Sequence, residues 1–460
     1  MFTKETYINR RSELKKSLKS GILLFLGNEE SPMNYADNTF HFRQDSTFLY
    51  FFGMDFAGLA GVIDLDEDKE ILFGNDLTVE DIVWMGTQPT LMQRCERYGI
   101  SQTRPYSQLA GYLISAINKG RVVHYLPPYR PENKIKLMDM LGVSPAIVQS
   151  KSSTELVRAV VDLRNHKSTE EISEIERAVN ISVDMHVMAM KMAKPHIKES
   201  ELAAAVTQVA LAAGGQLSFP VIMTINGQTL HNHYHGNTLK SGDMVLCDCG
   251  AETGMHYAGD LSSTFPVDPH FTSRQKEIYQ IVLSAHEAAK TRLAPGVPFR
   301  EVHFAACRTL INGLKEISLM KGDTEEALAM GAHAMFFPCG TGHMMGLDVH
   351  DMEDLGEVYV GYNGQPKSTQ FGLKSLRLAR PMEEGFVATI EPGLYFIPEL
   401  IASWKKDNIN SSFINFSKVE AYSTFSGIRN EEDVVITHDG YRVLGKKKPM
   451  TIEEVEDLRR

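Results

Sequence analysis

Two aspartates lie where two neighbouring strands could direct both side chains to one point. Asp248 ends the apolar run that begins at Met244, and a connection carrying Gly250 and Gly254 leads to a second short extended segment that ends in Asp260. This pattern predicts a β-hairpin with a carboxylate on each arm. Acidic residues are disfavoured in strands and costly to bury unless a positive charge neutralises them. The pair therefore predicts a cation site.

Further side chains that bind metals occur at strand ends or turns in the C-terminal half. Glu391 follows an apolar strand and precedes a Pro-Gly turn, and Glu431 lies at the entry to a predicted strand over 433–437. A glycine-rich turn supplies His343 and His350. Two Asp, two Glu and one His form an oxygen-rich set, which suits Mn²⁺ or a similar divalent ion better than a thiolate zinc site does. Four carboxylates carry enough charge for two ions that share bridging ligands.

The elements that must position these residues begin with a long helix after Ser168. Ser168 and the glutamate three residues later form a capping box, and apolar positions follow at helical spacing. Two further helices are predicted over about 199–213 and 273–293. The rest of the chain from Gly331 alternates short strands with glycine-rich turns. Two polar stretches within it are interpreted as loop insertions, 358–379 and 396–426.

The N-terminal part of the chain predicts a separate α/β unit. Residues 5–18 have the spacing of a helix, and the aromatic-rich segment 42–54 alternates partially, which favours a strand. Strands are predicted at residues 21–29, 60–65, 70–74, 122–128 and 143–149. No glycine loop for phosphate accompanies them, so nucleotide binding has little support. We predict an N-terminal domain over 1–162 and a second domain over 163–460.

The composition limits the partners and the compartment of the protein. A net charge of −11 disfavours nucleic acid and anionic membranes as partners, and no apolar run is long enough to span a bilayer. The first thirty residues do not resemble a signal peptide. Five cysteines, an odd number, favour reduced thiols and a cytoplasmic location. Cys247 and Cys249 are too close in sequence for a zinc knuckle. His303 and His333 are interpreted as structural or surface residues.

Four C-terminal motifs resemble, in their order, those of the pita-bread metallopeptidases, and most closely those of aminopeptidase P. They are LCDCG…YAGDLSSTFPV, GTGHMMGLDVHDM, TIEPGLY and GIRNEEDVVIT. The N-terminal segment FRQDSTFLYFFGM, followed by IVWMG, resembles the N-terminal domain of the same family. The resemblance implies an α/β (α+β) fold. An N-terminal α/β domain would precede a duplicated catalytic domain with a curved antiparallel sheet.

The resemblance also implies a metal role for each of the five residues. Asp248 would chelate one ion, Asp260 and Glu431 would bridge two ions, and His343 and Glu391 would complete the second site. Such a pair would lower the pKa of a shared water so that a nucleophile exists near neutral pH. Two divalent ions, Mn²⁺ by the donor chemistry above, are therefore the expected cofactors.

Other residues match positions of the family that act on substrate. His231 would bind substrate near the scissile bond, and His350 would hydrogen-bond the scissile carbonyl or its oxyanion. Glu391 could carry a proton to the leaving nitrogen, and Arg429 would hold a ligating carboxylate. Trp84 resembles a tryptophan that lines a substrate site, sometimes in a neighbouring subunit, although a buried aromatic is an equally good interpretation.

The expected activity is release of the N-terminal residue from peptides with proline in second position, by a homo-oligomer that is a dimer or a tetramer. Prolidase, which cleaves only Xaa-Pro dipeptides, shares the metal ligands and remains the alternative. A non-catalytic pita-bread binding module is the second alternative. Each site residue considered alone could be an ordinary turn or surface residue, so the prediction depends on all five metal positions occurring in family order.

The sequence departs from the family pattern in two places. The family commonly has a histidine four positions before its metal-binding histidine, where this chain has Cys339. A thiol is the poorer hydrogen-bond donor, so a substrate contact at that position is in doubt. The connection from Asp248 to Asp260 is also one residue longer than usual, which a bulge or a looser turn would absorb.

Overall fold

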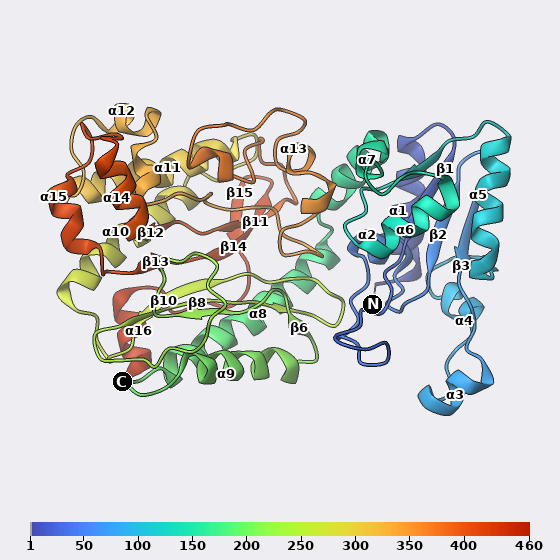
Figure 1. Cartoon of the computed structure of the whole chain (residues 1–460), viewed down its shortest axis with the longest axis horizontal. Coiled ribbons are helices and arrows are strands. Elements are labelled where there is room, and N and C mark those ends of the chain that lie inside the picture. The colour runs from blue at the N-terminus through green and yellow to red at the C-terminus, as the bar shows by residue number, and fades with distance from the viewer. Residues whose placement is uncertain (1) are drawn as a thin grey trace. The chain divides into compact units, whose positions relative to one another are not determined.

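The computed structural model describes residues 2–460, and its chain divides into two compact units. One unit comprises the chain up to Arg164 together with Met352–Tyr359, and the other comprises Asn165–Asp351 and Val360–Arg460. Figure 1 labels the elements of both. None of the helices in the described part of the chain combines the length and the apolar character that crossing a bilayer requires.

The first unit is built on a five-stranded mixed sheet with the strand order β4-β3-β2-β1-β5. Its strands are β1 (Ile22–Leu26), β2 (Ala60–Asp64), β3 (Lys69–Phe73), β4 (Gln102–Arg104) and β5 (Val123–Tyr125). Its helices are α1 (Lys4–Ser17), α2 (Ser46–Phe52), α3 (Val79–Met85), α4 (Leu91–Glu96), α5 (Leu109–Asn118), α6 (Pro131–Leu141) and α7 (Thr154–Asn165). The strands β1 to β3 pair antiparallel, and β4 and β5 add in parallel at the two edges. Apolar side chains of β1 to β3 and of α5 form one buried core.

The aromatic segment predicted as a strand is instead the helix α2. Asp45 caps this helix by accepting the backbone N–H of Phe48, and Gly53 ends it with a left-handed backbone, φ 70°. Every residue of α2 is buried. A helix that is buried on all sides shows no helical spacing of apolar and polar residues in its sequence. The aromatic content of this segment therefore favours a strand. The strand predicted over 143–149 is also absent, since that segment forms a turn before a short 3₁₀ helix.

The second unit opens with two helices that run side by side, α8 (Thr169–Met192) and α9 (Glu199–Ala212) (Figure 1). The predicted capping box is present at the start of α8, where Ser168 and Glu171 bond reciprocally. A three-stranded antiparallel sheet of order β10-β8-β7 follows, and α8 contacts its strand β10. The strands of this half are β6 (Gln216–Leu217), β7 (Ile222–Thr224), β8 (Met244–Asp248), β9 (Ala251–Glu252) and β10 (Ser262–Pro266).

The same order of a helix pair and antiparallel strands then recurs in the remainder of this unit. The helices α10 (Ser273–Lys290) and α11 (Phe299–Glu316) pack against each other. They precede a sheet of order β11-β14-β15 and a separate pair, β12 with β13. These strands are β11 (Val387–Ile390), β12 (Gly393–Tyr395), β13 (Gly427–Arg429), β14 (Glu432–Thr437) and β15 (Gly440–Val443). The remaining helices of this unit are α12 (Thr324–Ala329), α14 (Pro398–Lys406), α15 (Phe416–Val419) and α16 (Ile452–Arg459), while α13 (Glu357–Val360) lies mostly in the segment that belongs to the first unit.

The two stretches interpreted as loop insertions contain helices. Within 396–426, α14 has a proline in its first turn, where the missing N–H costs nothing, and it buries Ile401 and Trp404 on one face. The first stretch, 358–379, contains most of α13 and a short 3₁₀ helix over Leu373–Ser375. The many polar residues around these short apolar faces concealed the helices in the sequence.

Candidate metal centre

The hairpin of β8 and β10 brings Asp248 and Asp260 to the same end of one sheet. Ser262 pairs with Asp248 in the antiparallel register, and Asp260 lies two residues before β10 begins. Asp260 therefore precedes the second arm of the hairpin, whereas the sequence suggested that it ends an extended segment. Both aspartates are buried. The connection between them includes β9, which pairs with β6 and also bridges to Ala258 within the same connection.

The pairing of β11 with β14 places Glu391 beside Glu431. Ile390 pairs with Glu432, and the two glutamates lie directly outside this last pair, one after β11 and one before β14. Ser262 connects them to the aspartates, because its carbonyl accepts the backbone N–H of Glu431 at 3.1 Å and its hydroxyl donates to the Glu431 carboxylate at 2.8 Å. The four carboxylates thus come from two hairpin-like pairs that meet at one point.

His343 adds the single imidazole of this group. Its Nε2 lies 3.3 Å from Asp260 Oδ2 and 3.6 Å from Glu391 Oε1. Its Nδ1 lies 3.1 Å from the carbonyl oxygen of Met344, so an Nδ1–H donates there and Nε2 is the nitrogen that faces the carboxylates. Histidine ligands of metal ions commonly have one nitrogen bonded to a carbonyl in this way, which leaves the other nitrogen to bind the ion once its proton is lost.

Repulsion between these buried groups makes it strongly unfavourable for all the carboxylates to be ionised when no cation is bound. Burial raises the pKa of the Asp248 carboxyl to about 6 and that of Glu391 to about 7, and the charge of Asp260 adds to both effects. The pKa of Glu431 is raised well above its usual range by burial and by the neighbouring carboxylates. Burial lowers the pKa of His343, but the hydrogen bond to Asp260 and the charge of Glu391 outweigh it and hold the value near 9. A bound cation would remove this repulsion and keep the carboxylates ionised.

The donor set fits divalent ions. Ligand atoms of Asp260, His343 and Glu431 all lie within 4.8 Å of one another, and Asp248 and Glu391 line the same pocket. Nearby Asp433 is fully buried, and its Oδ1 has no hydrogen-bond partner among the described residues, which also indicates a missing positive charge. Carboxylates with one imidazole are the ligands that Mn²⁺ and similar ions prefer. All five residues predicted as ligands therefore converge.

The pocket around these residues also contains the two histidines predicted to act on substrate. His231 and His350 line it, and the His350 ring lies 4.3 Å from the His343 ring, centroid to centroid, in an edge-to-face arrangement. His233, interpreted as a solvated loop residue, is both exposed and part of the lining. Cys339 lines the pocket as well. The apolar part of the lining consists of Phe219, Pro220, Ile222, Leu230 and Val349.

Arg429 is buried beside the pocket and contacts a ligand candidate directly. Its guanidinium donates to the Asp248 carboxylate and, at 2.9 Å and 2.8 Å, to the hydroxyl oxygens of Ser262 and Tyr395. Trp84 does not line this pocket. It lies on α3 in the first unit, and 82% of its surface is exposed, so the alternative of a buried aromatic is wrong.

The sequence did not reveal three residues that support this centre. Ser262 bridges the two halves of the site as described above. The Asp433 carboxylate accepts the backbone N–H of Asp260 at 3.0 Å, and the buried Lys448 donates its ammonium to the Ser262 carbonyl. Asp433 could have been found, because it lies two residues after Glu431 and so on the same face of the strand. Lys448 lies outside every motif, and its local sequence carries no signal.

Comparison with known proteins places the chain in one family. Residues 173–438 match the model of metallopeptidase family M24, and residues 7–124 match that of the aminopeptidase P N-terminal domain. An Xaa-Pro dipeptidase of Rattus norvegicus is 31% identical over 465 residues, which are 98% of this chain and 92% of that protein. An Xaa-Pro aminopeptidase of Escherichia coli is 29% identical over 476 residues, 99% and 98% of the two chains.

The solved structures support the same assignment. A zinc-substituted aminopeptidase P of E. coli, described as in complex with product, superimposes with a TM-score of 0.81 at 27% identity and covers 99% of this chain and 98% of its own. The match extends over both units. The chain therefore belongs to metallopeptidase family M24, has the pita-bread fold of the aminopeptidase P structures, and is a metal-dependent peptidase.

Proposed function

We propose that this chain removes the N-terminal residue from peptides that have proline in second position. The observation that carries the proposal is the convergence of four carboxylates and the His343 imidazole in one pocket. The N-terminal family match and the likeness to solved aminopeptidase P support the aminopeptidase specificity. A tertiary amide at proline has no N–H, so a peptidase that holds such a bond must recognise the ring and the carbonyl oxygen instead.

The proposed metal centre holds two divalent ions, with Mn²⁺ as the expected species. Asp248 would bind one ion, Asp260 and Glu431 would bridge both, and His343 and Glu391 would complete the second site. When bound, such a pair supplies a nucleophile near neutral pH and stabilises charge that develops on the scissile carbonyl oxygen. The oxygen-rich donor set supports Mn²⁺, while the zinc-substituted relative indicates that a related centre can take another divalent ion.

The remaining pocket residues would bind and orient the peptide. His350 is placed beside His343 and would donate a hydrogen bond to the scissile carbonyl oxygen, and His231 would contact substrate near the same bond. Glu391 is the carboxyl that would transfer a proton to the leaving nitrogen. The five apolar lining residues named above would receive the proline ring. Arg429 would fix Asp248 by charge-assisted hydrogen bonds.

Trp84 is proposed to contact substrate from a neighbouring copy of the chain. Its side chain is exposed on a helix that has no buried residue, and Val79 and Val83 of the same helix are 80% and 74% exposed. This exposure supports a homo-oligomer, a dimer or a tetramer, in which the helix is covered. Light scattering of the purified protein tests the oligomeric state, and Trp84→Ala tests the contact through KM.

We also propose a cytoplasmic location, which the five free cysteines support.

A second candidate function is Xaa-Pro dipeptidase activity. The dipeptidases of rat and of other mammals are 30 to 31% identical to this chain over nearly its whole length, slightly more than the aminopeptidases at 28 to 29%. The two enzyme types share the metal ligands expected here. They differ in whether the site accepts residues beyond the proline.

A peptide panel separates the two candidates. The purified enzyme, loaded with Mn²⁺, is assayed on Xaa-Pro dipeptides and on Xaa-Pro-Yaa tripeptides with the same first residue, with Xaa-Ala-Yaa as the control for proline specificity. We expect turnover of the tripeptide with release of the first residue. Activity confined to the dipeptide would replace the proposal with the dipeptidase, and equal cleavage of the alanine peptide would contradict both.

A further inference from the structure

A second group of potential metal ligands lies in the pita-bread unit and shares no residue with the carboxylate centre. His303 and Cys307 are one turn apart on α11, and His333 comes from a short 3₁₀ helix, Ala332–Met335. Their exposed surface is 0% for His303 and Cys307 and 1% for His333. One nitrogen or sulfur atom of each residue lies within 4.8 Å of the others. Three donors therefore converge in a space closed to bulk solvent.

Two of the donor atoms, which are in hydrogen-bond contact, have a spacing that is compatible with a shared metal ion. Cys307 Sγ lies 3.4 Å from His303 Nε2. In a tetrahedral zinc site with bonds of about 2.0–2.3 Å, a nitrogen and a sulfur ligand lie about 3.5 Å apart. The other nitrogen of His303, Nδ1, lies 2.8 Å from the hydroxyl of Thr341. With Nδ1–H donating to Thr341, the lone pair of Nε2 faces the cluster, as it does in histidine ligands held by a second partner.

His333 supplies an independent observation. Neither of its ring nitrogens has a hydrogen-bond partner among the described residues, although the side chain is buried. Leaving a buried polar atom unpaired costs free energy, so an unpartnered imidazole in a packed interior indicates a missing ligand. Burial also lowers the pKa of His303 to about 3 and that of His333 to about 4, so both rings are neutral, which is the form that binds metals.

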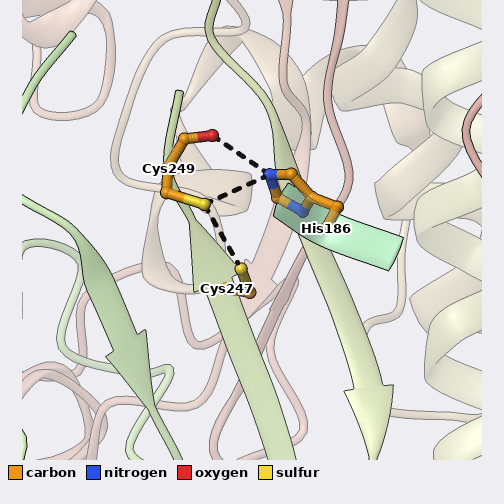
Figure 2. A group of neighbouring side chains, drawn as sticks. All are labelled: His186, Cys247 and Cys249. Atoms are coloured by element: carbon orange, nitrogen blue, oxygen red, sulfur yellow. Dashed lines mark hydrogen bonds between the residues drawn. The ribbon is translucent and has the colours of Figure 1, made fainter. Parts of the chain in front are cut away.

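A second cluster of similar composition lacks this arrangement. His186, Cys247 and Cys249 lie together, and Figure 2 shows the imidazole directed at Cys249. Its Nε2 lies 3.1 Å from the carbonyl oxygen of Cys249, so that nitrogen carries the proton and donates it to the backbone. The nitrogen nearest the thiols is thus occupied. The two clusters differ in the tautomer that their hydrogen bonds favour.

We propose that His303, Cys307 and His333 bind one thiophilic transition-metal ion, Zn²⁺ or Cu⁺, through two imidazole nitrogens and one thiolate. Soft nitrogen and sulfur donors select these ions over Mn²⁺ or Mg²⁺, which the carboxylate centre prefers. Binding releases the thiol proton of Cys307 to solvent and involves no change of oxidation state. The chain would then bind two kinds of metal ion at two sites, each selected by whether its ligands are soft or hard donors.

The proposed site contacts the segment that carries His343. Thr341, which bonds to His303, also accepts the backbone N–H of Glu391 on its carbonyl at 2.7 Å. An ion that fixes His303 would therefore hold the turn between Thr341 and His343 in place. We expect the ion to contribute to stability and not to take part in the reaction.

Metal analysis of the full chain tests the proposal. The double variant Asp260→Asn, Glu431→Gln removes two ligands of the carboxylate centre, so that metal retained after dialysis against a chelator reports other sites. Prepared with Zn²⁺ or, separately, with Cu⁺, it should retain about one ion per chain. Replacement by Co²⁺ should give a near-ultraviolet thiolate-to-cobalt charge-transfer band. Adding Cys307→Ala should remove the ion and the band, whereas Cys95→Ala, the loss of another buried thiol, should not.

His333→Phe provides a readout that does not depend on the double variant. If His333 binds an ion, this change in the otherwise unaltered chain lowers the melting temperature of the zinc- or copper-loaded protein and removes about one ion per chain. If His333 has no ligand, the change replaces two unpaired buried nitrogens with apolar atoms and should leave the melting temperature equal or higher. That outcome, or retention of the ion in Cys307→Ala, overturns the proposal.

Discussion

The guanidinium of Arg429 donates to the carboxylate of Asp248, and both side chains are buried. The same group bonds to the hydroxyl oxygens of Ser262 and Tyr395. Asp248 is therefore held in one orientation by a planar, permanently charged partner that is itself fixed at two further points. We propose from this relationship that Arg429 presents Asp248 to the pocket.

The first prediction concerns this contact. Arg429→Lys keeps the positive charge but loses the fork of donors, so Asp248 should be less well oriented and metal affinity should fall by about 10- to 100-fold. Titration of the metal-free enzyme with Mn²⁺, followed by calorimetry, measures the change. Tyr395→Phe is the matched control, because it removes one partner of Arg429 and leaves the bond to Asp248. Unchanged affinity in the lysine variant would contradict the assigned task.

Loss of a bridging carboxylate should have the larger effect. Asp260→Asn and Glu431→Gln keep the size of each side chain but remove a ligand charge shared by both ions. Turnover should fall by more than about 100-fold, beyond the effect expected for a residue that only supports a ligand. Metal content should fall from two ions per chain. Asp439→Asn, at an exposed aspartate, serves as the control, and near-normal turnover in either bridging variant would disprove the bridging roles.

The two substrate histidines should behave differently from the metal ligands. His350→Ala should retain the metal content of the unaltered enzyme and lower kcat by about 10²- to 10³-fold, because it removes a donor to the carbonyl oxygen. His231→Ala should retain metal and raise KM. His233→Ala changes a third histidine of the same pocket and provides the comparison. Loss of metal in His350→Ala would show that His350 acts as a ligand.

Cys339 stands where the family commonly has a histidine, and Cys339→His tests whether the local geometry is retained. Cys339 is partly exposed in the pocket lining, which leaves room toward the substrate side. We expect the variant to fold with an unchanged melting temperature and to keep its turnover on Xaa-Pro-Yaa peptides. Failure of this variant to fold would show that the packing around position 339 differs from that of the family.

The five candidate metal ligands could be identified from sequence because each lies near the end of a recognisable strand or in a glycine-rich turn. Asp248 and Glu391 follow apolar runs, and Glu431 precedes one, which is a local pattern. The glycine-rich turn supplies His343 and His350, and the motif resemblance gives the metal role to His343 and supports the order of the set. Convergence itself depends on pairings between distant segments, such as Ile390 with Glu432, and only the structure shows those.

The incorrect predictions arose where tertiary burial overrides local preference. The helix α2 is buried on every side, so neither a helical nor a strand period could identify it. Lys448 donates to the backbone of Ser262 from 186 residues away, a contact without a local signal. The prediction that His303 and His333 are structural or surface residues is not contradicted, since both side chains are buried. Their proximity to Cys307 becomes visible only when α11 and the 3₁₀ helix after Gly331 are placed together.

The most direct test of the account measures Xaa-Pro-Yaa hydrolysis against metal content. Chelator-treated enzyme should be folded and inactive, and stepwise addition of Mn²⁺ should restore release of the first residue until two ions are bound to the carboxylate centre. Asp260→Asn treated in the same way should not recover. Full activity of the metal-free enzyme, or no hydrolysis of any Xaa-Pro peptide after two ions have bound, would contradict the account.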